Sequence, residues 1–333
     1  MHSRGLAALS LLAALIAGPA EADDTIRILC PTWSGFAPAF VANDLGYFKK
    51  LGIEVDIKFE DERPNVMAAM ARGDIEMDMR TLGEYQGRPR DETTPGIIIG
   101  TIDESLGGDG VIVDGSIKTA ADLKGKTVAS EPNIPGRLLL QMELKKSGLT
   151  LKDVEIKEIS TADTVPVYSD TSITAIATFE PFLSQTLDKD ATRKPHLLVS
   201  SRDYPGLIVD GIIVRQDDLK QNPEKYRKFL IGLYRAIGYF ASNRADFIKL
   251  AAPHFNLSPK EFEDSIEGSL VYTAYPTVAT YLGKPGTPGT IYPVFDTVMQ
   301  LNLENGAADH HLAADKQIDN SIIGGISPAD LGG

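Results

Sequence analysis

Apolar runs of strand length alternate with helical segments along most of the chain. An apolar run at residues 26–29 ends at Pro31, and residues 36–50 then have the pattern of a helix. Residues 53–59 alternate apolar and polar side chains with period two, which is typical of a half-buried strand. This β-α-β order favours a mostly parallel sheet covered by helices, because parallel strands need long crossover connections.

The alternation continues in two series that are separated near Gly110. Further strands are predicted at 75–79, 97–102, 111–113, 127–130, 154–159, 173–178, 197–200 and 208–214, and helices at 65–72, 119–124, 137–147, 224–243 and 259–268. A chain of 333 residues is also longer than one hydrophobic core usually supports. The sequence therefore predicts an α/β protein of two folding units.

The amino terminus has the architecture of a signal peptide. Arg4 precedes an apolar run at residues 6–17, Pro19 breaks that run, and the small-x-small tripeptide that ends at Ala22 fits a signal peptidase site. The run is too short for a stable bilayer span, which needs about 20 residues. The alternative is an ordinary buried helix. We expect residues 1–22 to be removed near Ala22 and the mature protein to be exported to the periplasm.

Composition excludes several classes of function. The net charge of −13 argues against nucleic acid, whose binding needs a basic face. The single cysteine, Cys30, excludes an internal disulfide and a cysteine zinc site, and we expect it to be a buried thiol. No phosphate loop, His-Glu-x-x-His or Gly-x-Ser-x-Gly motif is present, and the adjacent pair His310 and His311 does not suit a metal. We expect no catalysis, no metal and no cofactor.

Four stretches of sequence carry a family resemblance. They are WSGFAPAFVA at 33–42 with LGYFKKLGIEV at 45–55, MARGDIE at 70–76, DESLGGDG at 103–110 leading into IKTAADLKGKTVA at 117–129, and FEP at 179–181. In this order they resemble the nitrate/taurine/sulfonate branch of ABC-importer substrate-binding proteins, which belongs to a superfamily that also contains a thiamine-pyrimidine synthase. The chain departs from the family pattern at 169–172, and at 88–92, where RPRDE replaces a more apolar helix.

The resemblance implies a type II periplasmic-binding-protein fold. Each of its two lobes would be a mostly parallel sheet flanked by helices, with two crossing strands near 111–114 and 210–214. Lobe one would then comprise residues 23–112 and 211–333, and lobe two residues 113–210. The resemblance also implies a monomer that binds a small-molecule solute between the lobes and transiently contacts an ABC permease at the inner membrane.

Candidate ligand-binding residues follow the predicted strands, because open α/β sheets bind ligands beyond the carboxyl ends of their strands. They are Trp33, Ser34, Gly35, Thr81, Glu84, Ser105, Asp109, Glu131, Pro135, Gly136, Arg137, Phe179, Glu180 and Asp210. Asp103 lies in the same segment as Ser105. Trp33 could stack on a planar or cationic group, and the alternative is that it packs a loop.

The charge of the ligand is open at this point. Carboxylates at Glu131, Glu180, Asp109 and Asp210 would suit an amine, amidine or guanidine group, because a buried charge needs a partner. Alternatively, some of them cap helices or pair with lysines. A sulfonate would instead use the helix start at 135–137 and donors such as Arg80, Arg137, Ser34 and Thr81.

Other functions remain as alternatives to the capture of a cationic solute. They are taurine, alkylsulfonate or nitrate binding on the same fold, binding or synthesis of a thiamine-pyrimidine precursor, and a sensor subunit that presents its ligand to a membrane receptor. The synthase of the superfamily carries a cysteine-rich iron motif, and this chain has one cysteine. We therefore predict a binding protein rather than an enzyme.

Overall fold

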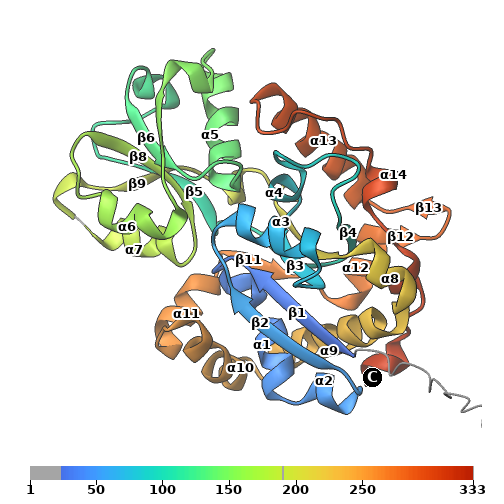
Figure 1. Ribbon diagram of the computed structural model, residues 1–333. Helices are drawn as coiled ribbons and strands as arrows, with labels where there is room; N and C mark the ends of the chain where they lie inside the picture. Colours follow the sequence, from blue (N-terminus) through green and yellow to red (C-terminus); the bar gives the residue numbers. More distant parts are fainter. Residues whose placement is uncertain (1–23, 190, 333) are drawn as a thin grey trace, which may run out of the picture.

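The computed structural model describes residues 24–189 and 191–332, which form two α/β lobes (Figure 1). The predicted signal peptide at 1–22 lies outside these residues. Each lobe is built on one main sheet with helices against it, as the sequence predicts. None of the helices between residues 24 and 332 has both the length and the apolar character that a membrane crossing requires.

The sheet of lobe one has six strands in the order β11-β4-β10-β3-β1-β2. These are β1 (Thr25–Cys30), β2 (Glu54–Phe59), β3 (Met77–Thr81), β4 (Ile97–Ser105), β10 (Val209–Val214) and β11 (Leu270–Tyr272). β1 pairs in parallel with β2 and β3, whereas β10 lies antiparallel between β3 and β4. The first four strands therefore run in one direction, as predicted for a mostly parallel sheet, whereas β10 and β11 are reversed and make the sheet mixed.

The sheet of lobe two has five strands in the order β7-β6-β8-β5-β9. These are β5 (Asp109–Val113), β6 (Thr127–Ser130), β7 (Glu155–Glu158), β8 (Ile173–Phe179) and β9 (His196–Ser200). β5 is antiparallel to both of its neighbours, and the other pairs are parallel. In both lobes a reversed strand, β5 or β10, directly follows a passage of the chain from one lobe to the other.

The two passages lie a few residues before the predicted crossings. The chain leaves the first sheet after Ser105 and enters the second at Asp109, and it returns between Ser200 and Val209. The predicted crossings, 111–114 and 210–214, largely coincide with β5 and β10, which are already inside the sheets. The predicted crossings were placed on apolar residues, and these mark the buried part of a strand rather than a passage between sheets. The first passage instead contains Gly107, with φ at 125°, and Gly108. The lobe boundaries at 112/113 and 210/211 stay a prediction.

Helices pack against the apolar faces of both sheets. In lobe one, α1 (Ala37–Asp44), α9 (Pro223–Ser242) and α10 (Arg244–Ala251) pack together, and in lobe two α5 (Pro135–Lys146) lies on β5, β8 and β9. The single helix predicted at 36–50 is wrong. Gly46, with φ at 68°, ends α1 and starts a separate short helix, α2 (Tyr47–Lys50), because a left-handed residue cannot continue a helix.

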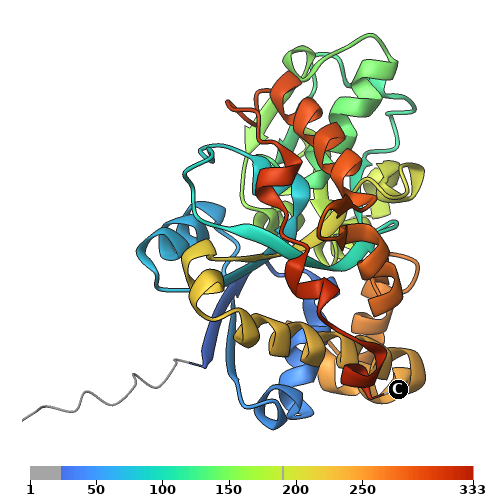
Figure 2. The ribbon, with the colours of Figure 1, turned by 90° about the vertical axis from the view of Figure 1, so that its right-hand side faces the viewer.

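The carboxyl-terminal segment connects the two lobes. Helix α13 (Ile291–Glu304) packs on α4 (Leu82–Gln86) of lobe one and also reaches α5 of lobe two (Figure 2). The Gln141 side chain donates to the Leu301 carbonyl at 3.3 Å, and Lys145 pairs with Glu304 at 2.9 Å. This contact lies on the opposite side of α5 from its sheet and holds the lobes close together.

Candidate ligand-binding site

A cavity lies between the lobes where strand ends from both sheets meet. Its lining is Pro31, Trp33, Phe36, Thr81, Glu84, Asp109, Pro135, Phe179 and Asp210, and its volume is about 20 Å³. Asp109 is the cross-strand partner of Phe179 in lobe two, and Asp210 is the cross-strand partner of Thr81 in lobe one. We call this cavity the acidic cleft.

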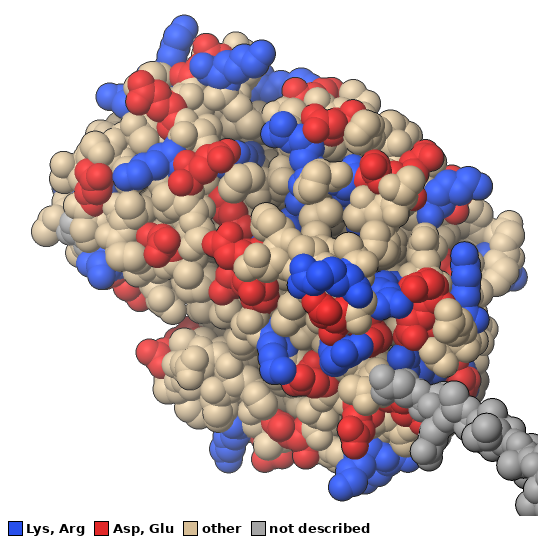
Figure 3. All heavy atoms as spheres, in the orientation of Figure 1, with Lys and Arg blue, Asp and Glu red and all other residues tan. Residues whose placement is uncertain are grey.

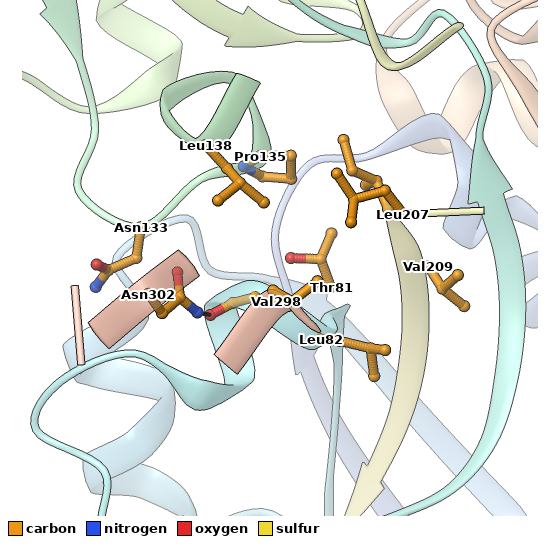
Figure 4. A pocket seen from close by; sticks show the side chains of 11 residues that line it. Thr81, Leu82, Asn133, Pro135, Leu138, Leu207, Val209, Val298 and Asn302 are labelled. Atoms are coloured by element: carbon orange, nitrogen blue, oxygen red, sulfur yellow. Dashed lines mark hydrogen bonds between the residues drawn. The ribbon is translucent and has the colours of Figure 1, made fainter. Parts of the chain in front are cut away.

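A second hollow continues from the acidic cleft between the lobes. Figure 4 shows its lining, in which Thr81 and Pro135 are shared with the cleft and Leu82, Leu138, Leu207, Val209 and Val298 add apolar side chains. At its edge, the Asn302 side chain donates to the Gly83 carbonyl at 3.0 Å. The space between the lobes therefore has two parts: the acidic cleft carries the carboxyl groups, and the second hollow is mainly apolar.

The indole of Trp33 and the carboxyl group of Asp210 line the cleft, and both contact the buried carboxyl group of Asp103 beneath them. Trp33 Nε1 lies 3.2 Å from Asp103 Oδ2, and the Asp103 and Asp210 carboxyl groups are hydrogen bonded to each other. Burial raises the pKa of both carboxyl groups, and their mutual interaction separates them, with the pKa of Asp210 raised more strongly. A Cβ on Gly35 would lie 2.3 Å from Asp103 Oδ2, so only glycine fits beside this group.

Asp109 faces the cleft from lobe two. Burial raises the pKa of its carboxyl group to about 8, against a hydrogen bond from Ser105 that lowers it. Repulsion from Glu84, Asp103 and Glu180 raises this pKa further. The mutual repulsion shows that the carboxyl groups of both lobes act on one shared space.

Glu180 and Glu131 lie just outside the cavity lining. Glu180 accepts a hydrogen bond from Ser184 Oγ at 2.7 Å, and Glu131 accepts one from Thr161 Oγ1 at 2.7 Å. Burial raises the pKa of each carboxyl group to about 7. Glu131 lines the mouth of the space between the lobes, and Figure 3 shows acidic side chains gathered near the boundary of the lobes.

Glu84 has a structural role as well as a place in the cleft. Its carboxylate accepts from the backbone N–H and the hydroxyl of Thr81 and so completes a capping box at the start of α4. Arg80 pairs with Asp78 at 2.6 Å and with Glu84 at 3.4 Å. Within the described part of the chain, Asp103, Asp109, Asp210, Glu131 and Glu180 form no salt bridge with lysine or arginine.

Seven of the predicted residues line the acidic cleft, and the other seven lie around it. Ser34 accepts a hydrogen bond from Ser265, and Ser105 is hydrogen bonded to Ser201. A Cβ on Gly136 would lie within 3.0 Å of backbone atoms of Gly110 and Thr178, so a glycine is needed there. Arg137 is engaged by Ser130 and Glu158 and does not line the cavity.

Pro31 and Phe36 line the cleft without having been predicted. Both lie in the loop and turn after β1, as Trp33 does. The predicted end of β1 could therefore have identified them as well.

Cys30, at the end of the same strand, is fully buried as predicted, and burial raises the pKa of its thiol. Among the described residues, no three His, Cys, Asp or Glu side chains are arranged to hold a metal ion.

Two α/β lobes with a cleft between them define the class of bilobal periplasmic-binding-protein folds. The family model described as "NMT1/THI5 like" matches residues 33–245, and the chain belongs to this family. A Brucella abortus protein named as a candidate binding protein is 22% identical over 267 residues, which are 79% of this chain and 82% of that protein.

Solved structures share the fold at low identity. The alkanesulfonate-binding protein SsuA of Xanthomonas axonopodis, bound to MOPS, has a TM-score of 0.74 at 16% identity, over 91% of this chain and all of that one. The nitrate-binding protein NrtA of Synechocystis has a TM-score of 0.68 at 15% identity, over 92% and 87%. The desulfurization enzyme DszB has a TM-score of 0.61 at 16% identity, over 90% and 97%. The resemblance predicted from the sequence is confirmed.

Proposed function

We propose that this chain is the periplasmic substrate-binding component of an ABC importer and that its solute carries a positively charged nitrogen group. Family membership and the fold shared with SsuA and NrtA support the role in transport. The observation that carries the ligand class is a set of buried carboxyl groups at and around the acidic cleft. Glu84 pairs with Arg80, whereas no salt bridge to lysine or arginine is formed, among the described residues, by Asp103, Asp109, Asp210, Glu131 and Glu180.

The free energy of burying carboxylates explains why a cation fits. A buried carboxylate is costly unless a positive group or hydrogen-bond donors accompany it, and without them it takes up a proton. The raised pKa values of Asp109, Glu131 and Glu180 are this response to burial. An ammonium, amidinium or guanidinium group would supply both the charge and the N–H donors.

Aromatic rings add a preference for the shape of the solute. Trp33 and Phe179 meet edge to face with centroids 6.1 Å apart, and Phe36 lines the same cavity. Ring faces attract a cation that lies over them, and planar groups stack on them. A small planar cation such as an amidine or guanidine uses both properties.

Closure of the lobes is the mechanism that the site supports. Trp33, Thr81 and Asp210 reach the cleft from lobe one, whereas Asp109 and Phe179 reach it from lobe two. A solute bound by both sets stabilises the closed arrangement over the open one, and the permease would recognise the closed form. The two passages between the sheets are the places where the hinge would lie. The protein would act as an exported monomer without cofactor.

Sulfonate or nitrate binding is the second candidate, because the similar proteins SsuA and NrtA are named for those ligands. Their anions would need free donors in the cleft. Here Arg80 pairs with Asp78 and Glu84, and Arg137 is held by Ser130, so an anion would meet mainly carboxyl groups. Catalysis, as in DszB, has no evident nucleophile in Cys30, which is buried and does not line the cleft. A sensor subunit would bind its ligand at the same site.

A thermal-shift screen of residues 23–333 tests the proposal. The panel contains guanidine, amidines, primary amines, taurine, alkylsulfonates, nitrate and pyrimidines, and a ligand at about 100 times its Kd stabilises by about 2.7 kcal/mol. We expect hits among the cations that Asp109→Asn abolishes and the exposed control Asp296→Asn retains. Hits only among sulfonates or nitrate would keep the role in transport and overturn the ligand class.

A further inference from the structure

Another cavity, distinct from the acidic cleft and from the second hollow, lies beside β3, and it shares no lining residue with the acidic cleft. It is lined by Arg63, Val66, Met67, Met70, Asp78, Arg80, Tyr85, Arg90, Thr94, Pro95 and Ile213, and its volume is about 20 Å³. Its arginines come from the start of α3 (Arg63–Arg72), from β3 and from the loop after α4. We call it the arginine cavity.

Polar atoms without partners concentrate in the arginine cavity. Arg63 Nε, Arg80 Nη2, Arg90 Nε and Asp78 Oδ1 are buried without a hydrogen-bond partner among the described residues. The four residues that carry these atoms are each at most 7% exposed. Buried polar groups are nearly always hydrogen bonded, so such a concentration needs a physical reason.

The guanidinium groups of Arg63 and Arg90 are held by neutral partners. Arg63 donates to the carbonyls of Gly87 at 2.6 Å and Arg88 at 2.5 Å. Arg90 donates to Tyr85 Oη at 2.7 Å and to the Gly96 carbonyl at 2.7 Å, and it stacks over the Tyr85 ring at 3.7 Å. These contacts fix the positions of the guanidinium groups without neutralising their charge.

The charges that line the cavity do not balance. Three guanidinium groups, those of Arg63, Arg80 and Arg90, line it together with one carboxylate, that of Asp78. Asp78 and Glu84 both pair with Arg80, and Asp91 acts on Arg90 from outside the lining. Burial, together with repulsion from Arg80, lowers the pKa of Arg63 to about 10 against the attraction of Glu84 and Asp78. The group therefore stays charged at neutral pH, and its burial is compensated only in part.

We propose that the arginine cavity is a second binding site and that it takes a small monovalent anion, either a halide or a compact carboxylate such as formate. The anion accepts hydrogen bonds from Arg63 Nε, Arg80 Nη2 and Arg90 Nε and supplies the missing negative charge. A water beside it donates to Asp78 Oδ1. The site goes beyond the proposed transport function and does not depend on it.

The loop after α4 offers a control for the charge of the cavity. Its segment 88–92 contributes Arg90 to the cavity wall. The neighbouring Arg88 is largely exposed and lies 4.0 Å from Asp309. Arg88 therefore provides a matched control, one that changes the charge of the same loop outside the cavity.

Bromide is the probe for a crystallographic test. Crystals of residues 23–333 grown with gluconate as the anion are soaked in sodium bromide, and diffraction is measured at the bromine absorption edge. We expect an anomalous peak among the three guanidinium groups, present in Arg88→Gln and absent in Arg90→Gln. A cavity that holds water alone, or bromide bound at the surface as an adventitious ion only, would overturn the proposal.

A solution measurement keeps the proposal testable if Arg90→Gln does not fold. The melting temperature of the wild-type protein is compared in sodium chloride and in sodium gluconate at equal ionic strength, since gluconate is too large for the cavity. We expect chloride to raise it by a few degrees, as binding to the folded state requires. Arg63→Gln should lose this difference, and Arg88→Gln should keep it. Equal melting temperatures in the two salts for wild type would contradict the site.

Discussion

The acidic cleft and the arginine cavity lie on the two sides of β3, and they bury opposite charges. Thr81 lines the cleft, whereas Asp78 and Arg80 line the cavity, because the side chains of neighbouring strand residues point to opposite faces. The Arg80–Glu84 pair is the link, since Glu84 lines the cleft. One strand end thus separates two buried clusters of opposite sign.

The two clusters differ in how they relieve their charge. A carboxyl group becomes neutral by binding a proton within the physiological range, as the raised pKa of Asp109 indicates. A guanidinium group cannot give up its proton in a protein, so its only relief is an anion or another acceptor. The comparison therefore predicts a cleft that responds to pH and a cavity that responds to anions.

The largest expected effect comes from removing the link between the two sites. Arg80→Met leaves Asp78 and Glu84 without their common partner, and breaking a buried ion pair on one side costs about 3–5 kcal/mol. Urea unfolding measures the loss. The control Arg72→Met removes an exposed pair with Asp74 and should cost less than about 1 kcal/mol. Similar losses in the two variants would show that Arg80 is not a buried link.

The second effect is a loss of ligand-free stability as pH rises. The pKa of Asp109 is about 8 in the folded protein and near 3.8 in the unfolded chain, so between these values the folded state binds more protons. Stability therefore falls as pH rises from 5 to 8, by about 2 kcal/mol after discounting for relaxation of the cleft. Melting curves across this range measure it, and Asp109→Asn should flatten the slope. Rising stability would contradict the charge state assigned to the cleft.

The third effect is a pH dependence of cation binding in the opposite direction. A cation favours ionised carboxylates, so affinity should rise as pH increases from 6 to 8, by about tenfold per unit for each proton released. Titration calorimetry with the best-stabilising cation, in two buffers of different ionisation enthalpy, counts the protons. An affinity that is constant over this range would mean that the carboxyl groups do not contact the cation. Bromide binding in the arginine cavity should change little over the same range.

The smallest effect separates the two sites. Trp33→Phe keeps a ring in the cleft and removes the indole N–H that donates to Asp103, which should cost about 1 kcal/mol. Thermal unfolding measures this loss, and solute affinity should weaken with it. The chloride-dependent rise in melting temperature should be unchanged, because Trp33 does not line the arginine cavity. A change in both would show that the sites are coupled through β3.

Much of the cleft could be predicted from the sequence because its residues follow strand ends. Trp33, Thr81, Asp109 and Phe179 lie at or next to the ends of strands that local apolar patterns reveal, and all four line the cavity. Arg137 was chosen in the same way and lies elsewhere. Its direction depends on contacts with Ser130 and Glu158, which the pattern of α5 does not contain.

The arginine cavity could not be predicted because the pattern of β3 suggests another environment. Its sequence, MDMRT, alternates apolar and polar residues as a half-exposed strand does, yet all five residues are buried. Arg63 of α3 and Arg90 of the loop at 88–96 cover the polar face. Burial of that face depends on segments distant in sequence.

The sequence alone determined the order of strands and helices, the direction of most strands and the family, because these follow from local side-chain patterns and short motifs. The tertiary structure alone decided which charges are buried together. Asp103 contacts Trp33 across 70 positions, and the carboxyl groups of both lobes meet only when the two sheets are placed side by side. Desolvation depends on everything that surrounds a side chain, so the electrostatics of the cleft and of the cavity arise only in the folded chain.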